Sequence, residues 1–287
     1  AIMKVLEELF STLKDFQTMV SGVDSSVDFS TLNSSAISAK KQIVNILSAD
    51  IYKRLLNGEG ELKEMLQLAV GNLTMAKDVP FDVIRKRKAD VDVYKYEMEN
   101  MRRSYVDNYF NAMDSLISIL ESDEKDPVKW KDTPYCKLRE NLKIKSTDEF
   151  NLLYPIDSSY LFFFRTIPIQ NEILDDTMAD YFVRAEKKEE LARRLKRALA
   201  QLTVATAIRR FDLIELPATI RNLYEDNTSQ RQASNEQSRL LELAADLAKS
   251  AMETMQNVDL TLSEPETNNI ETETSFNRPE DKIYLMS

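Results

Sequence analysis

Glycine is scarce in this chain and is confined to its first quarter. The sequence has 287 residues and only 4 glycines, all of which lie before residue 72. Rossmann folds, β-sandwiches and barrels need glycine at tight turns and at positions with positive φ. The long remainder without glycine therefore argues against these folds. We expect a helical protein, and the hydrophobic content of 43% is enough to bury a core.

The residues that most often carry catalysis are missing. Histidine, the commonest general base and a frequent zinc ligand, is absent from the sequence. The single cysteine, Cys136, excludes an internal disulfide and a paired-cysteine metal site. Without a histidine to activate it, we interpret Cys136 as a small hydrophobic side chain rather than a nucleophile. No glycine-rich phosphate loop occurs either. We predict that the protein is not an enzyme and holds no cofactor or metal.

One group of carboxylates needs a separate interpretation. Asp175, Asp176 and Asp180 fall close together in a segment that we expect to be helical. A metal site or an acid–base pair is one interpretation of such a group. Apolar residues are interleaved with these acids, and no basic motif accompanies them. We therefore favour a solvated helix face.

The most apolar stretch is SSYLFFFRTIPIQNEIL, residues 158–174, with three consecutive phenylalanines. Its uncharged run begins after Asp157 and ends at Arg165. A helix that spans a membrane needs roughly 20 apolar residues, so this run is far too short. We predict no membrane span here.

The spacing inside this stretch is helical. Tyr160, Phe164 and Ile167 recur at steps of three or four, and Pro168 is expected to kink or split the helix. We predict a helix that is buried on several sides at the centre of the domain. Phe163, Phe164 and Ile167 should therefore be mostly buried.

Hydrophobic periodicity along the whole chain predicts an all-α fold. We expect a multi-helix bundle of about seven to nine helices, with a long central helix and an extended C-terminal tail. The expected helices cover approximately residues 2–20 (lying at the periphery), 36–56, 62–79, 82–126, 147–154, 158–181, 186–211 and 234–258.

Some details of these helices follow from local signals. Segment 82–126 has neither proline nor glycine, so it should be the longest helix, and its Met and Tyr stripe is interpreted as a core seam rather than a binding groove. Capping boxes are expected at Ser146 with Glu149 and at Ser234 with Gln237. DLIELPATI, residues 212–220, reads as an extended connector.

Positive charge is concentrated although the chain is acidic overall. The formal net charge of −10 argues against nonspecific nucleic-acid binding by the whole surface. Residues 85–88 read RKRK, and residues 184–210 hold nine basic and three acidic side chains. In the second cluster, four cations lie opposite the leucine stripe of the predicted helix: Arg193, Arg194, Lys196 and Arg197. They are either a solvated helix surface or a contact for phosphates or an acidic partner.

The composition changes after residue 258, which divides the chain into a helical domain, 1–258, and an acidic tail, 259–287. The tail has seven acids against two bases and few apolar residues until its end. Its terminal sequence, FNRPEDKIYLMS, carries the candidate docking residues Phe276, Ile283, Tyr284, Leu285 and Met286. We predict that this end docks on an adjacent subunit or another protein, adding a strand or filling a groove. The alternative is a frayed terminus.

Three stretches resemble a known group of proteins. They are FSTLNSSAISAKKQIVNILSADIYKRLLNG, STDEFNLLYPIDSSYLFFFRTIPIQNEI and LARRLKRALAQLTVATAI. Together they resemble an all-helical family of Bacteroidetes phages and prophages, which in turn is similar to the head–tail connector (adaptor) proteins of tailed phages. The resemblance covers about residues 29–225. It consists of helix and aromatic patterns, and it carries no catalytic residues with it.

The resemblance implies a structural protein of the virion neck. Such proteins form a homo-oligomeric ring, commonly a dodecamer, between the portal protein and the next tail component. The subunit would fold in the cytoplasm of the bacterial host, since its first sixteen residues predict an amphipathic helix and not a secretory signal. In such a ring, Arg193, Arg194, Lys196 and Arg197 are candidates for the wall of the DNA channel, where contact with packaged DNA would be nonspecific. The alternative function is a cellular helical scaffold that binds other proteins.

Overall fold

A computed structural model of the protein describes residues 4–88, 95–221 and 233–263. The described part is all-α and contains no strand, as the sequence predicts. Seven α-helices have eight residues or more: α3 (Phe29–Leu47), α4 (Ala49–Leu56), α5 (Glu61–Lys88), α6 (Lys95–Ser122), α9 (Tyr160–Ile173), α11 (Glu189–Arg210) and α13 (Ala233–Ser263). The shorter ones are α1 (Val5–Leu9), α2 (Leu13–Met19), α7 (Pro134–Arg139), α8 (Thr147–Leu153), α10 (Ala179–Arg184) and α12 (Ala218–Arg221).

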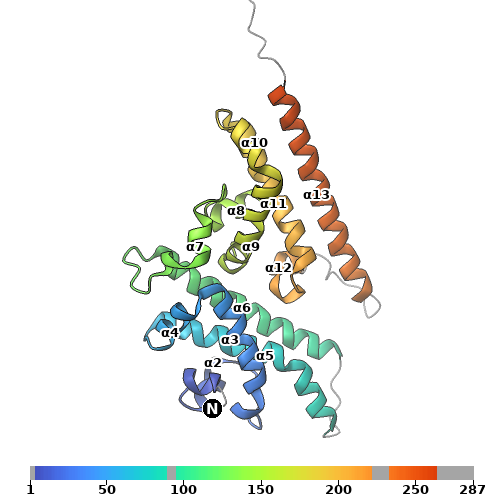
Figure 1. Cartoon of the computed structure of the whole chain (residues 1–287). Helices are drawn as coiled ribbons and strands as arrows, with labels where there is room; N and C mark the ends of the chain where they lie inside the picture. Colours follow the sequence, from blue (N-terminus) through green and yellow to red (C-terminus); the bar gives the residue numbers. More distant parts are fainter. Residues whose placement is uncertain (1–3, 89–94, 222–232, 264–287) are drawn as a thin grey trace, which may run out of the picture.

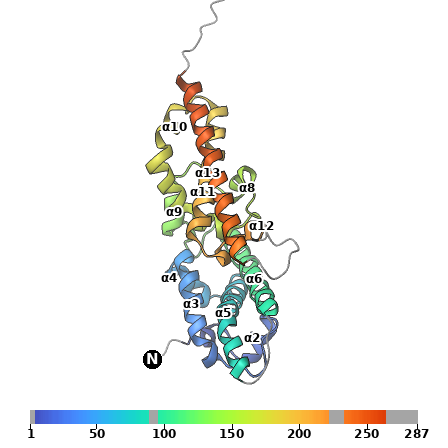
Figure 2. The same cartoon turned by 90° about the vertical axis from the view of Figure 1, so that its right-hand side faces the viewer.

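The molecule is elongated, with two helical layers stacked end to end (Figures 1 and 2). Helices α1–α5 lie at one end together with α6, and α5 packs along α6 in the most extensive helix–helix contact of the described chain. At the other end, α13 packs along α11, next to α9 and α10. Hydrophobic periodicity in the expected helix 234–258 predicts a buried stripe of Leu240, Ala244, Leu247, Ala251 and Met255; in α13 the last four are buried and Leu240 is partly buried.

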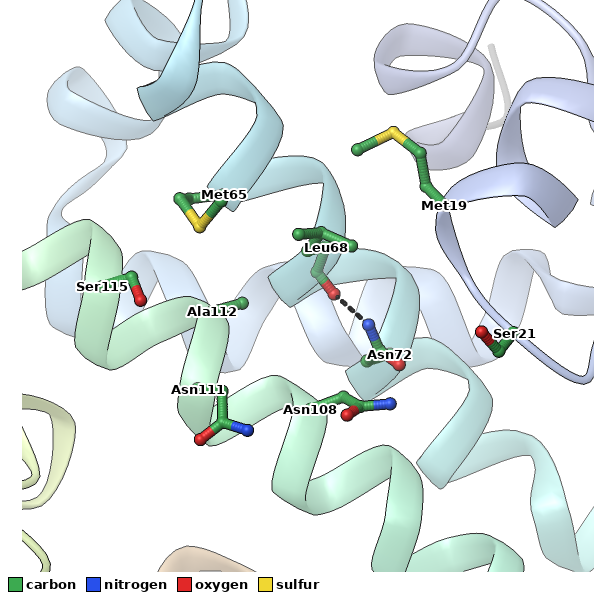
Figure 3. A pocket seen from close by; sticks show the side chains of 9 residues that line it. All are labelled: Met19, Ser21, Met65, Leu68, Asn72, Asn108, Asn111, Ala112 and Ser115. Atoms are coloured by element: carbon green, nitrogen blue, oxygen red, sulfur yellow. Dashed lines mark hydrogen bonds between the residues drawn. The ribbon is translucent and has the colours of Figure 1, made fainter.

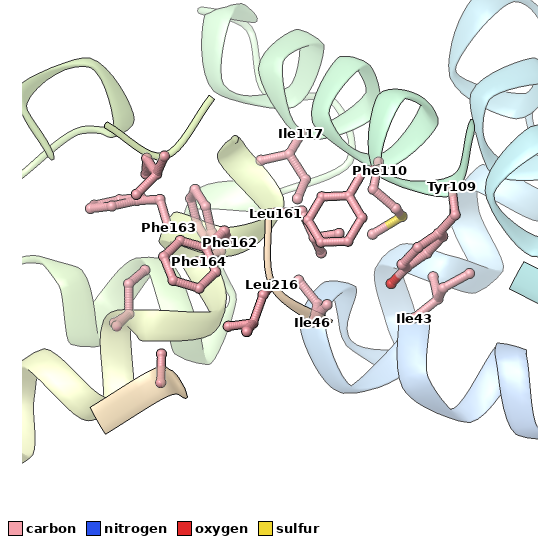
Figure 4. Packing of buried hydrophobic residues seen from close by; sticks show 14 of the residues in the cluster. Ile43, Ile46, Tyr109, Phe110, Ile117, Leu161, Phe162, Phe163, Phe164 and Leu216 are labelled. Carbon is pink, nitrogen blue, oxygen red and sulfur yellow. The ribbon is translucent and has the colours of Figure 1, made fainter. Parts of the chain in front are cut away.

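Helix α9 joins the two layers through a continuous core. Phe162, Phe163, Phe164 and Ile167 have no exposed surface, which confirms the prediction for the aromatic stretch. Figure 4 shows the phenylalanines of α9 in one cluster with Leu161 and Leu216, and Leu161 lies beside Phe110 of α6, the helix that packs against α9. Burial of three adjacent aromatic side chains requires neighbours on every side of the helix, and a central position supplies them.

Two prolines lie inside helices of the described chain. Helix α5 continues through Pro80 to Lys88, so the predicted boundary before Pro80 is wrong, and α9 continues through Pro168 to Ile173, so Pro168 does not split its helix. Both prolines are exposed, so their rings face solvent, while neighbouring residues of each helix are buried. Tertiary packing therefore offsets the backbone hydrogen bond that each proline removes. A π-helical turn, η2 (Leu174–Met178), follows α9 and holds Asp175 and Asp176.

Three other predicted elements differ from the structure. The expected helix 2–20 is divided into α1 and α2, because Thr12 caps α2 by accepting a 3.1 Å hydrogen bond from the Asp15 amide. The expected helix 36–56 begins earlier, at Phe29, and breaks at Ser48, whose φ of 76° is incompatible with a helix. Residues 212–220 form a 3-10 turn, η3 (Leu213–Glu215), and α12 instead of an extended connector.

The predicted helix 82–126 is also wrong. Residues 82–88 complete α5, and α6 ends at Ser122. At 31 residues, α13 is the longest helix of the described chain. The seam interpretation is confirmed for Tyr105, Tyr109, Met113, Leu116 and Leu120, which are buried.

The predicted capping signals have different outcomes. Ser146 caps α8, with its hydroxyl accepting a 3.1 Å hydrogen bond from the Glu149 amide. The Lys145 amide donates a 2.9 Å hydrogen bond to the Glu149 carboxylate. In a capping box, the donor would be the amide of the next residue, Ser146. Helix α13 begins at Ala233, and the side chains of Ser234 and Gln237 lie outside the described residues. The same helix ends at Ser263, beyond the predicted boundary at 258.

Gly71 explains how the N-terminal segment fits against α5. A Cβ at this position would lie 2.6 Å from Cγ2 of Val20 and 3.2 Å from Cε2 of Phe16. Such distances are shorter than carbon atoms tolerate, so only glycine allows this approach. The N-terminal helices are thus held directly on the α5 backbone.

Candidate functional site

A recess of about 340 Å³ lies where the N-terminal segment meets α5 and α6 (Figure 3). We call it the amide groove, after the three asparagines among its lining residues: Met19, Ser21, Met65, Leu68, Asn72, Asn108, Asn111, Ala112 and Ser115. Met65, Leu68 and Asn72 come from α5, and the residues from 108 to 115 come from α6. Met19 and Ser21 form the third wall.

Asn72 is the most deeply buried polar residue of this groove. Only 3% of its surface is exposed, and its Nδ2 donates a 2.8 Å hydrogen bond to the Leu68 carbonyl. Its Oδ1 is buried and has no hydrogen-bond partner among the described residues. A buried acceptor without a partner costs about 1–3 kcal/mol, so a rearrangement of Asn72 that gives its Oδ1 a donor would recover free energy.

The opposite wall is also built for hydrogen bonding. Asn108, Asn111 and Ser115 are exposed and occur at helical spacing along α6. The edge of the groove is fixed by Tyr105, whose hydroxyl donates a 3.0 Å hydrogen bond to the Ser21 carbonyl. Amide side chains both donate and accept, as a peptide backbone does. No lining side chain is charged, so the groove suits a neutral, extended peptide with apolar side chains.

The amide groove was not predicted from the sequence. The apolar residues of α6 dominate its hydrophobic periodicity, and this pattern predicts only the buried face of the helix. The available signal was the second stripe of α6, Asn108, Asn111 and Ser115, which is polar but uncharged in a helix surface otherwise rich in charge. Uncharged polar stripes at helical spacing are less costly to cover with a partner than charged ones.

The four candidate cations of α11 do not form a uniform surface. Lys196 donates a 2.5 Å hydrogen bond to Glu149, the acid at the start of α8, and Arg194 pairs with Glu190 at 2.7 Å. Arg193 and Arg197 are exposed and form no ion pair with the described residues. Pairing with acids of the same subunit weighs against a DNA contact for Lys196 and Arg194, and so only Arg193 and Arg197 retain that candidacy.

The RKRK cluster at residues 85–88 is partly neutralised. Arg85 pairs with the buried Asp78, and Lys86 lies 3.0 Å from Asp82. Asp78 also accepts a 3.3 Å hydrogen bond from Ser35 of α3. The first half of this cluster thus has a structural role at the end of α5.

Two further charged residues join the layers of the molecule. Arg221 of α12 is almost fully buried and donates hydrogen bonds to Asp107 of α6 and to the Leu216 carbonyl, both at 2.7 Å. Asp114 of α6 accepts hydrogen bonds from the Ser159 hydroxyl at 2.8 Å and the Leu161 amide at 2.9 Å. Asp114 thereby caps α9 together with Ser159.

Cys136 and the three aspartates of segment 175–180 are the side chains with potential for catalysis or metal binding. Cys136 is buried, and burial raises the pKa of its thiol to about 11, which disfavours the thiolate. Asp175 and Asp176 are exposed, and Asp180 pairs with Arg184 at 2.9 Å. Within the described residues, no group of three or more Cys, Asp or Glu side chains is placed to hold a metal ion.

The candidate docking residues of the tail, Phe276, Ile283, Tyr284, Leu285 and Met286, lie outside the described residues. Across the described helices, none combines the length and the apolar character needed to cross a membrane. No protein-family model matches the chain, and the searches of curated proteins and of solved structures found no match.

Proposed function

We propose that the protein is a structural virion protein of a tailed phage. It would form a head–tail connector ring that joins the portal to the tail and surrounds the DNA channel. One observation carries this proposal: two of the three stretches behind the resemblance pack against each other. The three stretches correspond mainly to α3–α4, α8–α9 and α11; α9 contacts both α8 and α11, and α3–α4 contributes to the same hydrophobic core from the other layer.

Other features support a role in assembly. The molecule is long rather than round, and α13 extends along one side of it (Figure 1). Apolar side chains remain exposed on α13, among them Leu241, Met252 and Leu260. An elongated helical subunit with apolar surface on its flank is suited to side-by-side packing in a ring.

The test is the mass and shape of the full-length protein in solution. Native mass spectrometry and negative-stain electron microscopy should detect a closed ring with a lumen wide enough for duplex DNA, alone or with the portal protein of the same phage. A protein that stays monomeric with and without that portal would contradict the proposal. A monomer that instead binds host proteins would support the alternative, a cellular helical scaffold.

A further inference from the structure

We propose that the amide groove binds the C-terminal segment of a second copy of this chain, residues 281–287 (DKIYLMS). This contact would link neighbouring subunits of the proposed ring. It rests on the proposed function only in one respect, namely that the assembly is a ring. Binding between tail and groove can be measured without reference to a phage.

The amide groove is chemically complementary to an extended peptide. An extended peptide presents alternating N–H and C=O groups, and the asparagines of the groove offer both partners. Asn108 and Asn111 are exposed in the groove, so an incoming backbone reaches their amides first, and a rotation of the Asn72 side chain would bring its unpartnered Oδ1 to a backbone N–H. Met19 and Met65 are adaptable side chains that pack against varied apolar groups.

The distribution of charge favours the apolar end of the tail as the occupant. The chain is acidic overall, with a formal net charge of −10, so two copies repel each other on average. The lining of the groove carries no charged side chain. Within residues 264–287, the longest apolar run is Ile283–Met286, and it follows the acidic part of the segment. This run is therefore the part of the tail that enters a neutral groove at the lowest cost.

The start of the tail and the amide groove lie at opposite ends of the subunit. Helix α13 ends at Ser263 at one end of the molecule, and the amide groove lies in the layer at the other end (Figures 1 and 2). Twenty-four residues follow Ser263, and a chain of this length spans at most about 80 Å when extended. A link from one end of a subunit to the opposite end of the next is a heterologous contact, which generates rings or filaments.

The test uses two full-length proteins that each carry one added cysteine. Ser115→Cys places a thiol in the groove, and Ser287→Cys places one at the chain end. The native Cys136 is buried, so it stays in both proteins as a common background. After mixing under mild oxidation, we expect a disulfide-linked heterodimer. An excess of a peptide of residues 276–287 should suppress it.

Matched controls make the result specific. Ser104→Cys is also exposed on α6 but does not line the groove, so it should give no heterodimer with Ser287→Cys. Asn111→Cys repeats the groove test at a second exposed position. Leu285→Asp, added to the Ser287→Cys partner, should abolish the cross-link because it puts a charge into the neutral groove.

Equal cross-linking of Ser104→Cys and Ser115→Cys would overturn the inference, as would the absence of a heterodimer from both groove positions. An intramolecular disulfide in a Ser115→Cys/Ser287→Cys double variant, without a heterodimer in the mixture, would also overturn it. Rings seen without the cross-link would refute this contact and leave the proposed function standing. A cross-link found only in linear or dimeric assemblies would support this contact and contradict the proposed ring.

Discussion

The carboxylate of Asp114 accepts a 2.8 Å hydrogen bond from the hydroxyl of Ser159, which itself caps α9. This contact ties α6 to the helix at the centre of the core. Burial raises the pKa of Asp114 from 3.8 to about 6, against the lowering effect of the hydrogen bonds from Leu161 and Ser159. The folded protein therefore binds a proton here that the unfolded chain releases.

From this pKa we predict an unusual pH dependence for one residue. Asp114 contributes stability that is fully present below pH 3.8 and is lost as the pH rises through about 6. An asparagine side chain at this position would keep the acceptor without the charge, so Asp114→Asn should gain stability relative to wild type between pH 4 and pH 7, by at most about 3 kcal/mol. Urea unfolding of both proteins at several pH values measures this. A stability difference that is the same at every pH would contradict the prediction.

The aromatic centre gives a second prediction. Phe164 is fully buried, with its ring 5.2 Å from that of Trp130 and 5.7 Å from that of Phe163. Phe164→Ala leaves a cavity among rigid neighbours and should lower the free energy of unfolding by roughly 3–5 kcal/mol. Leu152→Ala is the control, since Leu152 is 88% exposed and its truncation should change stability by less than about 0.5 kcal/mol. Equal effects in a denaturation series would refute the central position of α9.

Gly71 supports a third prediction. Alanine favours helices over glycine by about 1 kcal/mol, so Gly71→Ala would stabilise an isolated helix. Here the new methyl group meets Cγ2 of Val20 at 2.6 Å, and such overpacking typically costs about 1–3 kcal/mol. We expect a net loss of stability in thermal or urea unfolding. In a Val20→Ala background the loss should shrink or change sign, and a cost that is unchanged in that background would show that Val20 is not the obstacle.

The regular elements with strong periodicity were predictable. The buried stripe of α13, the burial of the phenylalanines and the cap at Ser146 all depend on residues close together in sequence. Sequence rules alone identify such elements because each local preference agrees with the final packing.

The wrong boundaries arise where packing overrides a local rule. Pro80 is a helix breaker by propensity, but α5 continues through it because buried residues on both sides of the proline hold the helix in place. At Ser48 a break occurs that no sequence signal predicts. The residues around Ser48 in the sequence do not indicate the positive φ that separates α3 from α4. The amide groove was not predictable, because its walls come from three segments whose contact depends on Gly71 and on the path of the N-terminal helices.

The exposed cations of α11 give a fourth prediction. If Arg193 and Arg197 contact DNA phosphates, Arg193→Gln/Arg197→Gln should weaken binding to duplexes of any sequence. Loss of two phosphate contacts should reduce the slope of log K against log salt by about 2. Fluorescence anisotropy with the assembled protein measures both effects.

Arg210→Gln is the matched control for that experiment. Arg210 lies on the same helix, but its guanidinium is held by Glu172 through two hydrogen bonds of 2.6 and 2.7 Å. It should affect DNA binding far less than the double substitution. If the control and the double variant behave alike, the assignment to Arg193 and Arg197 is wrong, and α11 is a solvated surface.

The last prediction concerns the end of the tail. Deletion of residues 276–287 should reduce assembly, because docking of Ile283–Met286 would bury side chains worth roughly 1.5–3 kcal/mol each before the cost of ordering the segment. On this hypothesis the unfolding of the single subunit should not change, because the segment docks on a neighbouring subunit and not on its own core. Analytical ultracentrifugation over a range of concentrations measures assembly, and urea unfolding measures the subunit. A full-length variant with serine at positions 283–286 keeps the length and the acidic residues of the tail, so it should reproduce the deletion. If both variants assemble with the yield and stability of wild type, the tail does not hold neighbouring subunits together.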